Sequence, residues 1–192
     1  MLKGKIFVIS APSGTGKTTI IKKIMEIFPQ LTFSISATTR ERRSFEVDGK
    51  DYFFISEEDF KNKIENDEFV EWEKFYDYFY GTLKSFVNKK LEENNSLIFE
   101  VDVKGALNIK KCYPESVLIF IEPPSIETIK ERLTRRNTES AEDFIKRIER
   151  ADLEMSFKDK FDYSVLNLDL EVAINEVKNI IENKLKGDNY AN

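Results

Sequence analysis

Histidine is absent from this chain of 192 residues, and cysteine occurs once, at Cys112. Without histidine, Ser–His and Cys–His nucleophiles are excluded, as are zinc sites that use imidazole. A single cysteine excludes an intramolecular disulfide and fits a reducing compartment, so a cytoplasmic protein is expected. The first strand pattern leads straight into a loop, which does not resemble a signal peptide.

Long hydrophobic runs and an excess of positive charge are missing as well. The longest apolar runs, Val117–Ile121 and Ile6–Ile9, are far shorter than the ~18 residues of a membrane span, so no membrane partner is expected. The net charge of −5 argues against broad nucleic-acid binding, which requires a basic face. With 41% hydrophobic and 34% charged residues, the chain has the composition of an ordinary globular protein.

The chain does contain a phosphate-loop motif near its start. It lies between a strand-like run, Ile6–Ser10, and a helical pattern that starts at Lys17. Two glycines let backbone N–H groups converge on phosphate oxygens, and the helix N-terminus adds the positive end of its dipole. Lys17 is expected to reach the β- and γ-phosphates of ATP as a catalytic charge, and Thr18 to ligate Mg²⁺. The expected ATP-binding residues of the loop are Ala11, Pro12, Ser13, Gly14, Thr15, Gly16, Lys17 and Thr18.

Ala11 stands where the strict motif has glycine, a position that alanine fills if its φ is negative. The alternative interpretation is a glycine-rich turn between a core strand and a helix, with Lys17 merely solvated. Phosphoryl transfer depends on positioning and charge neutralisation, so the missing histidines do not argue against it.

The alternation of strand and helix patterns predicts an α/β fold with a parallel sheet flanked by helices. Two stretches interrupt the alternation, an inserted α+β module and a long, charged helical segment. Together with the phosphate loop, this leads us to expect a P-loop kinase core with that module and a helical lid. The predicted core comprises 1–33, 95–131 and 159–192, the module 34–94 and the lid 132–158. The predicted core strands are Lys5–Ser10, Ser96–Val101, Ser116–Glu122 and Tyr163–Asn167. The predicted helices around them are Lys17–Phe28, Val103–Cys112, Ile126–Arg136 and Leu170–Leu185. For the module we predict strands at Tyr52–Ile55 and Phe69–Tyr80, and helices at Glu57–Glu65 and Leu83–Glu93.

Two arginine clusters suggest anion binding. Arg40, Arg42 and Arg43 lie within four residues and form either a phosphate clamp or a solvated surface. The second cluster is either a salt-bridged helix surface or a lid that carries arginines to the transferred phosphoryl group; it comprises Arg132, Arg135, Arg136, Arg147 and Arg150.

The sequence resembles the guanylate kinase family of nucleoside monophosphate kinases over nearly its whole length. The resemblance implies Mg²⁺-dependent phosphorylation of GMP, and of dGMP, to the diphosphate with ATP as donor. Its acceptor is already ionised at neutral pH, so no general base is needed. The segments that carry the resemblance are Ser10–Thr18, Phe33–Arg40, Glu68–Trp72, Phe79–Thr82 and Pro123–Ser125.

The resemblance also implies roles for single residues. Ser36, Glu71 and Thr82 would read guanine, with Glu100 near the base in place of the usual aspartate. The residues expected at the GMP phosphate are Arg40, Arg43, Tyr52 and Tyr80. On the ATP side the resemblance adds Arg132 and Asn167, and it gives the lid residues Arg136 and Arg147 a catalytic role.

Three alternatives remain at this point. A non-catalytic guanylate-kinase-like binding module shares these motifs, although such modules have damaged phosphate loops. A P-loop kinase for another monophosphate is the second, and Glu71 as an exposed strand carboxylate beside Trp72 is the third.

The sequence departs from the family pattern at two positions of the arginine loop. Arg42 stands in place of a usual proline and Phe45 in place of a glycine, and these departures predict a looser loop. The sequence does not indicate an oligomeric state.

Overall fold

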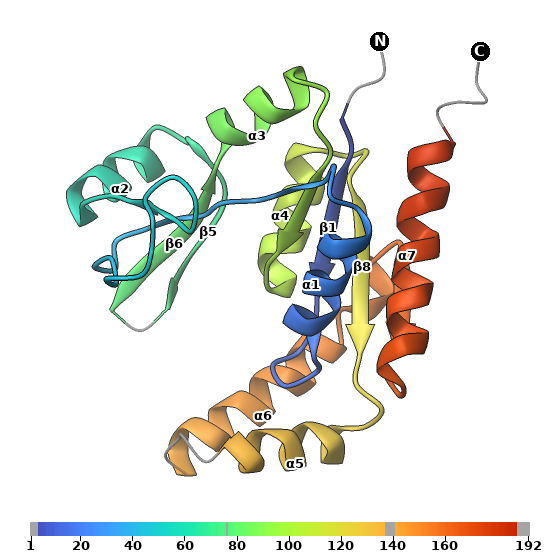
Figure 1. Ribbon diagram of the computed structural model, residues 1–192. Helices are drawn as coiled ribbons and strands as arrows, with labels where there is room; N and C mark the ends of the chain where they lie inside the picture. Colours follow the sequence, from blue (N-terminus) through green and yellow to red (C-terminus); the bar gives the residue numbers. More distant parts are fainter. Residues whose placement is uncertain (1–3, 76, 137–140, 188–192) are drawn as a thin grey trace.

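The computed structural model describes residues 4–75, 77–136 and 141–187 (Figure 1). Its centre is a sheet in which every neighbouring pair of strands is parallel, in the order β2-β7-β1-β8-β9. The carboxyl ends of these strands therefore meet at one edge, where ligands bind in open α/β sheets. The strands are β1 (Ile6–Ser10), β2 (Thr32–Phe33), β7 (Leu97–Glu100), β8 (Val117–Glu122) and β9 (Tyr163–Leu166).

Helices cover both faces of this sheet. In β1, Phe7 and Ile9 pack on the side of α1 (Lys17–Ile27) and α7 (Leu170–Lys186). Ile6 and Val8 pack on the opposite side, with α3 (Lys84–Glu92) and α4 (Val103–Cys112). Successive strand residues point to opposite faces, so burial on both sides requires the continuous apolar runs that the sequence shows. The predicted α/β fold with a parallel, helix-flanked sheet is confirmed.

The inserted module forms a second sheet, in the order β4-β3-β6-β5, to the left of the core in Figure 1. Its small core stacks Phe60 on Phe69, with ring centroids 4.3 Å apart. A register shift between Phe69 and Glu71 leaves Val70 outside the pairing, and Val70 packs into the main core instead. The elements are β3 (Ala37–Thr38), β4 (Phe53–Phe54), α2 (Glu57–Glu65), β5 (Phe69–Phe75) and β6 (Tyr78–Leu83).

The segment predicted as the lid, 132–158, contains the end of α5 (Ile126–Arg136) and the whole of α6 (Ala141–Met155) and runs into the 3₁₀ turn η1 (Lys158–Lys160). Ile129 and Ala151 are fully buried between the two helices. The long, charged and helical character predicted for this stretch is confirmed for its described residues. In that same described part of the chain, no helix has the length and apolar character of a membrane span.

The single run Phe69–Tyr80, expected as a strand, is a hairpin of two antiparallel strands. β2 and β3, of two residues each, were not predicted. The domain boundaries given above stay predictions.

Candidate active site

The phosphate loop joins the carboxyl end of β1 to the first turn of α1. Gly14 and Gly16 have φ values of +84° and +97°, which only glycine adopts without strain. A Cβ on Gly16 would also lie 3.0 Å from Nδ2 of Asn167. Both glycines are thus required by the backbone, as a loop that turns its N–H groups toward an anion demands.

Asn167 supports this loop from the end of β9. Its side chain is buried, and its Nδ2 donates a hydrogen bond of 2.7 Å to the carbonyl oxygen of Thr15. The amide therefore fixes the conformation of the loop, a role that the sequence did not indicate. A contact of Asn167 with ATP stays a prediction.

The two functional side chains that end the loop both reach toward β7. Nζ of Lys17 donates to the carbonyl oxygen of Val101 at 3.1 Å, and burial lowers the pKa of this amine against the opposing effect of nearby carboxylates. The hydroxyl of Thr18 donates to Oε1 of Glu100 at 2.7 Å. Glu100 is expected near the base from the sequence, whereas its carboxylate lies here on the phosphate-loop side of the site.

The residues expected to read guanine form one row across the inserted sheet. Glu71 pairs opposite Thr82 in the β5–β6 hairpin. Ala37 pairs opposite Gly81, so the preceding residue, Ser36, continues the same row on the other side of Thr82. Residues of one row share a face of the sheet. The hydroxyl of Thr82 donates to Oε1 of Glu71 at 2.7 Å, so the row is already connected by a hydrogen bond.

Glu71 is half-buried, and the exposed side chain at this point is its neighbour Trp72. Burial raises the pKa of Glu71 to about 7, against the opposing hydrogen bond from Thr82, and the charge of Asp102 adds to the rise. Gly105 lies between the two carboxylates: a Cβ there would be in van der Waals contact with Oε2 of Glu71 at 3.4 Å and tight against Oδ1 of Asp102 at 3.1 Å. The interpretation of Glu71 as a surface carboxylate is therefore wrong.

The residues expected at the GMP phosphate lie beside this row. Cζ of Arg40 lies 5.5 Å from the ring centroid of Tyr52, and the rings of Tyr52 and Tyr80 are 6.2 Å apart. Nη2 of Arg40 donates to Oε1 of Glu46 at 2.7 Å, and the backbone N–H of Arg43 donates to Oε2 of Glu46 at 2.8 Å. Glu46 thus organises the arginine loop around one buried carboxylate.

We did not assign a role to Glu46 from the sequence. An acidic residue three to six positions after the expected arginines could have indicated an ion pair within the loop. Arg42, which replaces a usual proline, donates from Nη1 to the carbonyl oxygen of Glu46 at 2.9 Å. The departure therefore adds a hydrogen bond to a loop that we expected to be looser. Phe45 is 75% exposed, and the side chain of Arg43 is exposed beside it.

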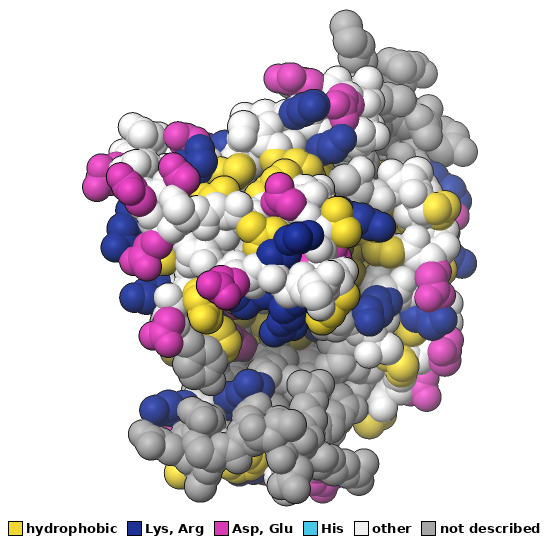
Figure 2. Space-filling model, turned by 60° about the vertical axis from the view of Figure 1, so that its left-hand side comes forward, with side chains coloured by type: hydrophobic (Ala, Val, Ile, Leu, Met, Phe, Trp, Pro, Cys, Tyr) yellow, Lys and Arg dark blue, Asp and Glu magenta, His cyan; other side chains and the backbone are white. Residues whose placement is uncertain are grey.

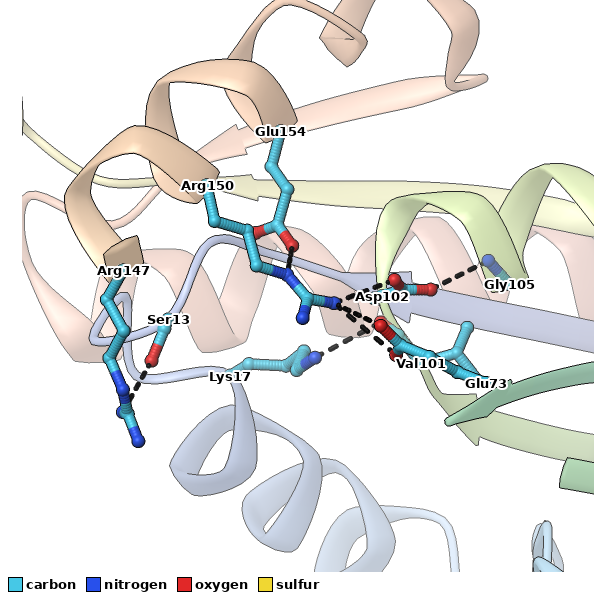
Figure 3. A network of polar contacts seen from close by, with 9 residues as sticks. All are labelled: Ser13, Lys17, Glu73, Val101, Asp102, Gly105, Arg147, Arg150 and Glu154. Atoms are coloured by element: carbon cyan, nitrogen blue, oxygen red, sulfur yellow. Dashed lines mark hydrogen bonds and ion pairs between the residues drawn. The ribbon is translucent and has the colours of Figure 1, made fainter. Parts of the chain in front are cut away.

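The lid helix α6 reaches the phosphate loop through Arg147, whose Nη1 donates to Oγ of Ser13 at 3.3 Å. The side chains of Arg132 and Arg136 lie outside the described residues. The loop, the lid and the inserted module line one cavity of about 350 Å³, whose charged walls include Lys17, Glu73, Asp102, Arg147, Arg150 and Glu154. Figure 3 shows Glu73, Asp102 and Glu154 gathered around Arg150, with Lys17 nearby and Arg147 apart from them beside Ser13.

The sequence matches the family described as guanylate kinase over residues 3–184. The chain belongs to the guanylate kinase family. A guanylate kinase from Caldanaerobacter subterraneus subsp. tengcongensis is 50% identical over 179 residues, which are 93% of this chain and 87% of that protein. A guanylate kinase from Thermotoga maritima is 44% identical over 183 residues, which are 95% of this chain and 88% of that protein.

Structure gives the same assignment. The crystal structure of guanylate kinase from Anaplasma phagocytophilum superposes on this chain with a TM-score of 0.72 and 29% sequence identity. The superposition covers 96% of this chain and 87% of the Anaplasma chain. As a member of the guanylate kinase family, the chain is a nucleotide-binding enzyme that transfers phosphoryl groups. Its phosphate loop retains both Lys17 and Thr18.

Proposed function

We propose that this enzyme transfers the γ-phosphoryl group of ATP to GMP, giving ADP and GDP, by in-line displacement. The observation that carries the proposal is the shared cavity: Glu73 lines it together with the phosphate loop. Glu71 lies two residues from Glu73 in the same strand, hence on the same face of the inserted sheet. When Glu71 binds the base of a nucleotide, the phosphate of that nucleotide would therefore point along this face toward the phosphate loop.

On the donor side, the loop N–H groups and Lys17 would hold the ATP phosphates. Arg147, with the lid arginine Arg136, would add charge as the γ-phosphoryl group moves between oxygens. Fixed positive groups aimed at developing charge stabilise the transition state in a site from which water is excluded. The acceptor is an ionised phosphate oxygen of GMP, so the reaction needs no general base and tolerates a protein without histidine.

The donor side also fits Mg²⁺. The hydroxyl of Thr18 and the carboxylate of Glu100 are hard oxygen donors of the kind that Mg²⁺ binds together with nucleotide phosphates, and they lie in direct contact. Thr18 would be a ligand of the ion, and Glu100 would orient that ligand. When bound, Mg²⁺ neutralises charge on the phosphate oxygens of ATP.

On the acceptor side, guanine offers two adjacent donors, N1–H and the 2-amino group, and an acceptor at O6. The carboxylate of Glu71 supplies acceptors for the donors in a charge-assisted pair. The hydroxyl of Ser36 is available to O6, and that of Thr82 would reach O6 only by leaving the carboxylate of Glu71, to which it donates here. The GMP phosphate would bind Arg40, Arg43, Tyr52 and Tyr80. These roles involve base and phosphate alone, so we expect dGMP to be a second acceptor.

The test is a coupled spectrophotometric assay with ATP, Mg²⁺ and one of five acceptors: GMP, dGMP, AMP, UMP or CMP. Adenine places an acceptor, N1, against Glu71, so discrimination between GMP and AMP should reach about 10⁴ in kcat/KM. Turnover of none of the five would indicate a non-catalytic binding module. Preference for AMP, UMP or CMP would indicate a kinase for another monophosphate.

A further inference from the structure

Arg150 on α6 connects three parts of the enzyme through ion pairs (Figure 3). Its Nη2 donates to Oδ2 of Asp102 at 2.9 Å and to Oε1 of Glu73 at 3.1 Å. Its Nε donates to Oε1 of Glu154 at 2.9 Å. Glu73 belongs to β5 of the inserted module, Asp102 to the core where α4 begins, and Glu154 to α6 itself. One guanidinium thus joins the lid, the core and the inserted module.

Two of the three partners are themselves held in place. Glu154 lies one helical turn from Arg150 and is only 8% exposed. Asp102 accepts a second hydrogen bond at Oδ1, from the backbone N–H of Gly105 at 2.7 Å. The side chain of Glu73 is 43% exposed and comes from the other module. The lid and core therefore present a fixed guanidinium, and Glu73 is the partner that closure of the inserted module adds.

Glu73 occupies an informative place in the inserted sheet. It pairs opposite Tyr80, next to the row formed by Glu71 and Thr82. Alternate residues of a strand share a face, so Glu73 lies on the face that carries the expected base- and phosphate-binding groups. Fixing Glu73 against the lid therefore fixes these rows relative to the phosphate loop.

We propose that Arg150 is a positioning residue that holds the inserted module closed against the lid and the core, so that the acceptor phosphate lies in line with the γ-phosphoryl group. The identity of that acceptor rests on the proposed function above. Alignment of two bound reactants lowers the barrier strongly and is lost by small displacements. Arginine suits this task because its planar fork serves several carboxylates at once, which the point charge of a lysine does not.

Arg150 also balances charge in the cavity wall. Removing it would leave Glu73, Asp102 and Glu154 facing a site for polyanionic nucleotides. An Arg150→Gln variant would therefore combine loss of closure with repulsion of the substrates. Glu73→Gln is the selective change, because it removes the charge from the contact between modules, leaving at most a neutral hydrogen bond there, and keeps the bonds of Arg150 to Asp102 and Glu154.

The chain offers a matched control in Glu68→Gln. The Glu68 side chain is 41% exposed, close to the value for Glu73, and it pairs with Lys63 at 2.9 Å within the inserted module. Spin labels at Lys61 on α2 and Ile145 on α6, both exposed, would report the distance between module and lid in a Cys112→Ser background. Without nucleotide, the parent and Glu68→Gln should share one short distance. Glu73→Gln should add a longer component, and an unchanged distribution in Glu73→Gln would overturn the proposal.

Kinetics supply the second measurement. Loss of an exposed pair should raise the KM for GMP in Glu73→Gln by about two- to fivefold at low salt. The difference from the parent should shrink at about 0.5 M salt, where the pair is screened in the parent too. Glu68→Gln should show neither effect. If Glu73→Gln only damaged the local structure, its effect on the KM for GMP would not depend on ionic strength. A difference in KM that is the same at low and high salt would therefore contradict the positioning role.

The two proposals fail separately. If neither the parent nor any variant phosphorylates GMP, the proposed function is wrong. The distance measurement still decides whether the pair of Arg150 and Glu73 holds the inserted module against the lid. If GMP is phosphorylated and the distances do not respond to Glu73→Gln, the positioning role alone is wrong.

Discussion

The hydroxyl of Thr82 donates a hydrogen bond of 2.7 Å to the carboxylate of Glu71 across the β5–β6 hairpin. Burial favours the protonated form of Glu71 and raises its pKa to about 7, while this hydrogen bond favours the ionised form. Guanine would add two further donors to the same carboxylate. Binding of the base and ionisation of Glu71 are therefore coupled.

This coupling predicts that the KM for GMP depends on pH. Below about pH 7 an increasing fraction of Glu71 is protonated, so the KM for GMP should rise by up to about tenfold per pH unit as pH falls. Steady-state kinetics between pH 5.5 and 8.5 would measure the effect, with the KM for ATP as an internal control. A flat KM profile for GMP would contradict it.

The same raised pKa predicts that the free energy of unfolding falls as pH rises, whereas binding of GMP improves. The folded state binds the Glu71 proton more tightly than the unfolded chain, whose carboxyl titrates near the ordinary value of 4.5. The resulting stabilisation is full below about pH 4.5 and is lost as pH rises to about 7, a change of up to about 3 kcal/mol. Glu71→Gln should therefore gain stability relative to the parent between pH 5 and pH 8 in urea unfolding. A constant difference would show that burial does not perturb this group.

Lys17→Met keeps an unbranched apolar side chain of similar length and removes the charge. Because this charge is aimed at phosphate oxygens that gain charge during transfer, kcat should fall on the order of 10²-fold or more. Steady-state assays at saturating ATP and GMP would measure it. A changed KM for ATP with an unchanged kcat would make Lys17 a binding residue only.

Arg43→Ala should act on the acceptor side. Its exposed guanidinium stands in the loop that Glu46 organises, so its loss should raise the KM for GMP about tenfold or more and leave the KM for ATP unchanged. Arg42→Ala is the comparison, since the guanidinium of Arg42 already bonds the carbonyl oxygen of Glu46. An equal effect of both substitutions would indicate damage to the loop instead of loss of a phosphate contact.

The parts of this structure that are local in the sequence were predictable. The strand, phosphate loop and first helix follow one another directly, and α2, α4 and α5 begin and end where their patterns indicate. The turn within 69–80 was missed because aromatic residues continue on both sides of it. β2 and β3 were missed because two residues carry no periodicity.

The site depended on contacts that sequence spacing does not encode. Ser36, Glu71 and Thr82 were expected to act together by resemblance, but the strand register that aligns them is a property of the folded sheet. The contact between Thr18 and Glu100 spans 82 residues, and that between Arg150 and Glu73 spans 77. Such pairs are fixed by how the modules pack, not by any local pattern.

In the proposed function Glu71 selects guanine. Whether it does is decided by kcat/KM for GMP and for AMP, measured in the parent, in Glu71→Gln and in the control Glu68→Gln. Glu71→Gln places an amide where an acceptor is needed, so it should lose about 10²-fold in kcat/KM for GMP, mostly through KM. ATP affinity should be unchanged, and Glu68→Gln should match the parent. If Glu71→Gln used GMP as well as the parent, or the parent phosphorylated AMP equally well, Glu71 would not be the residue that reads the base.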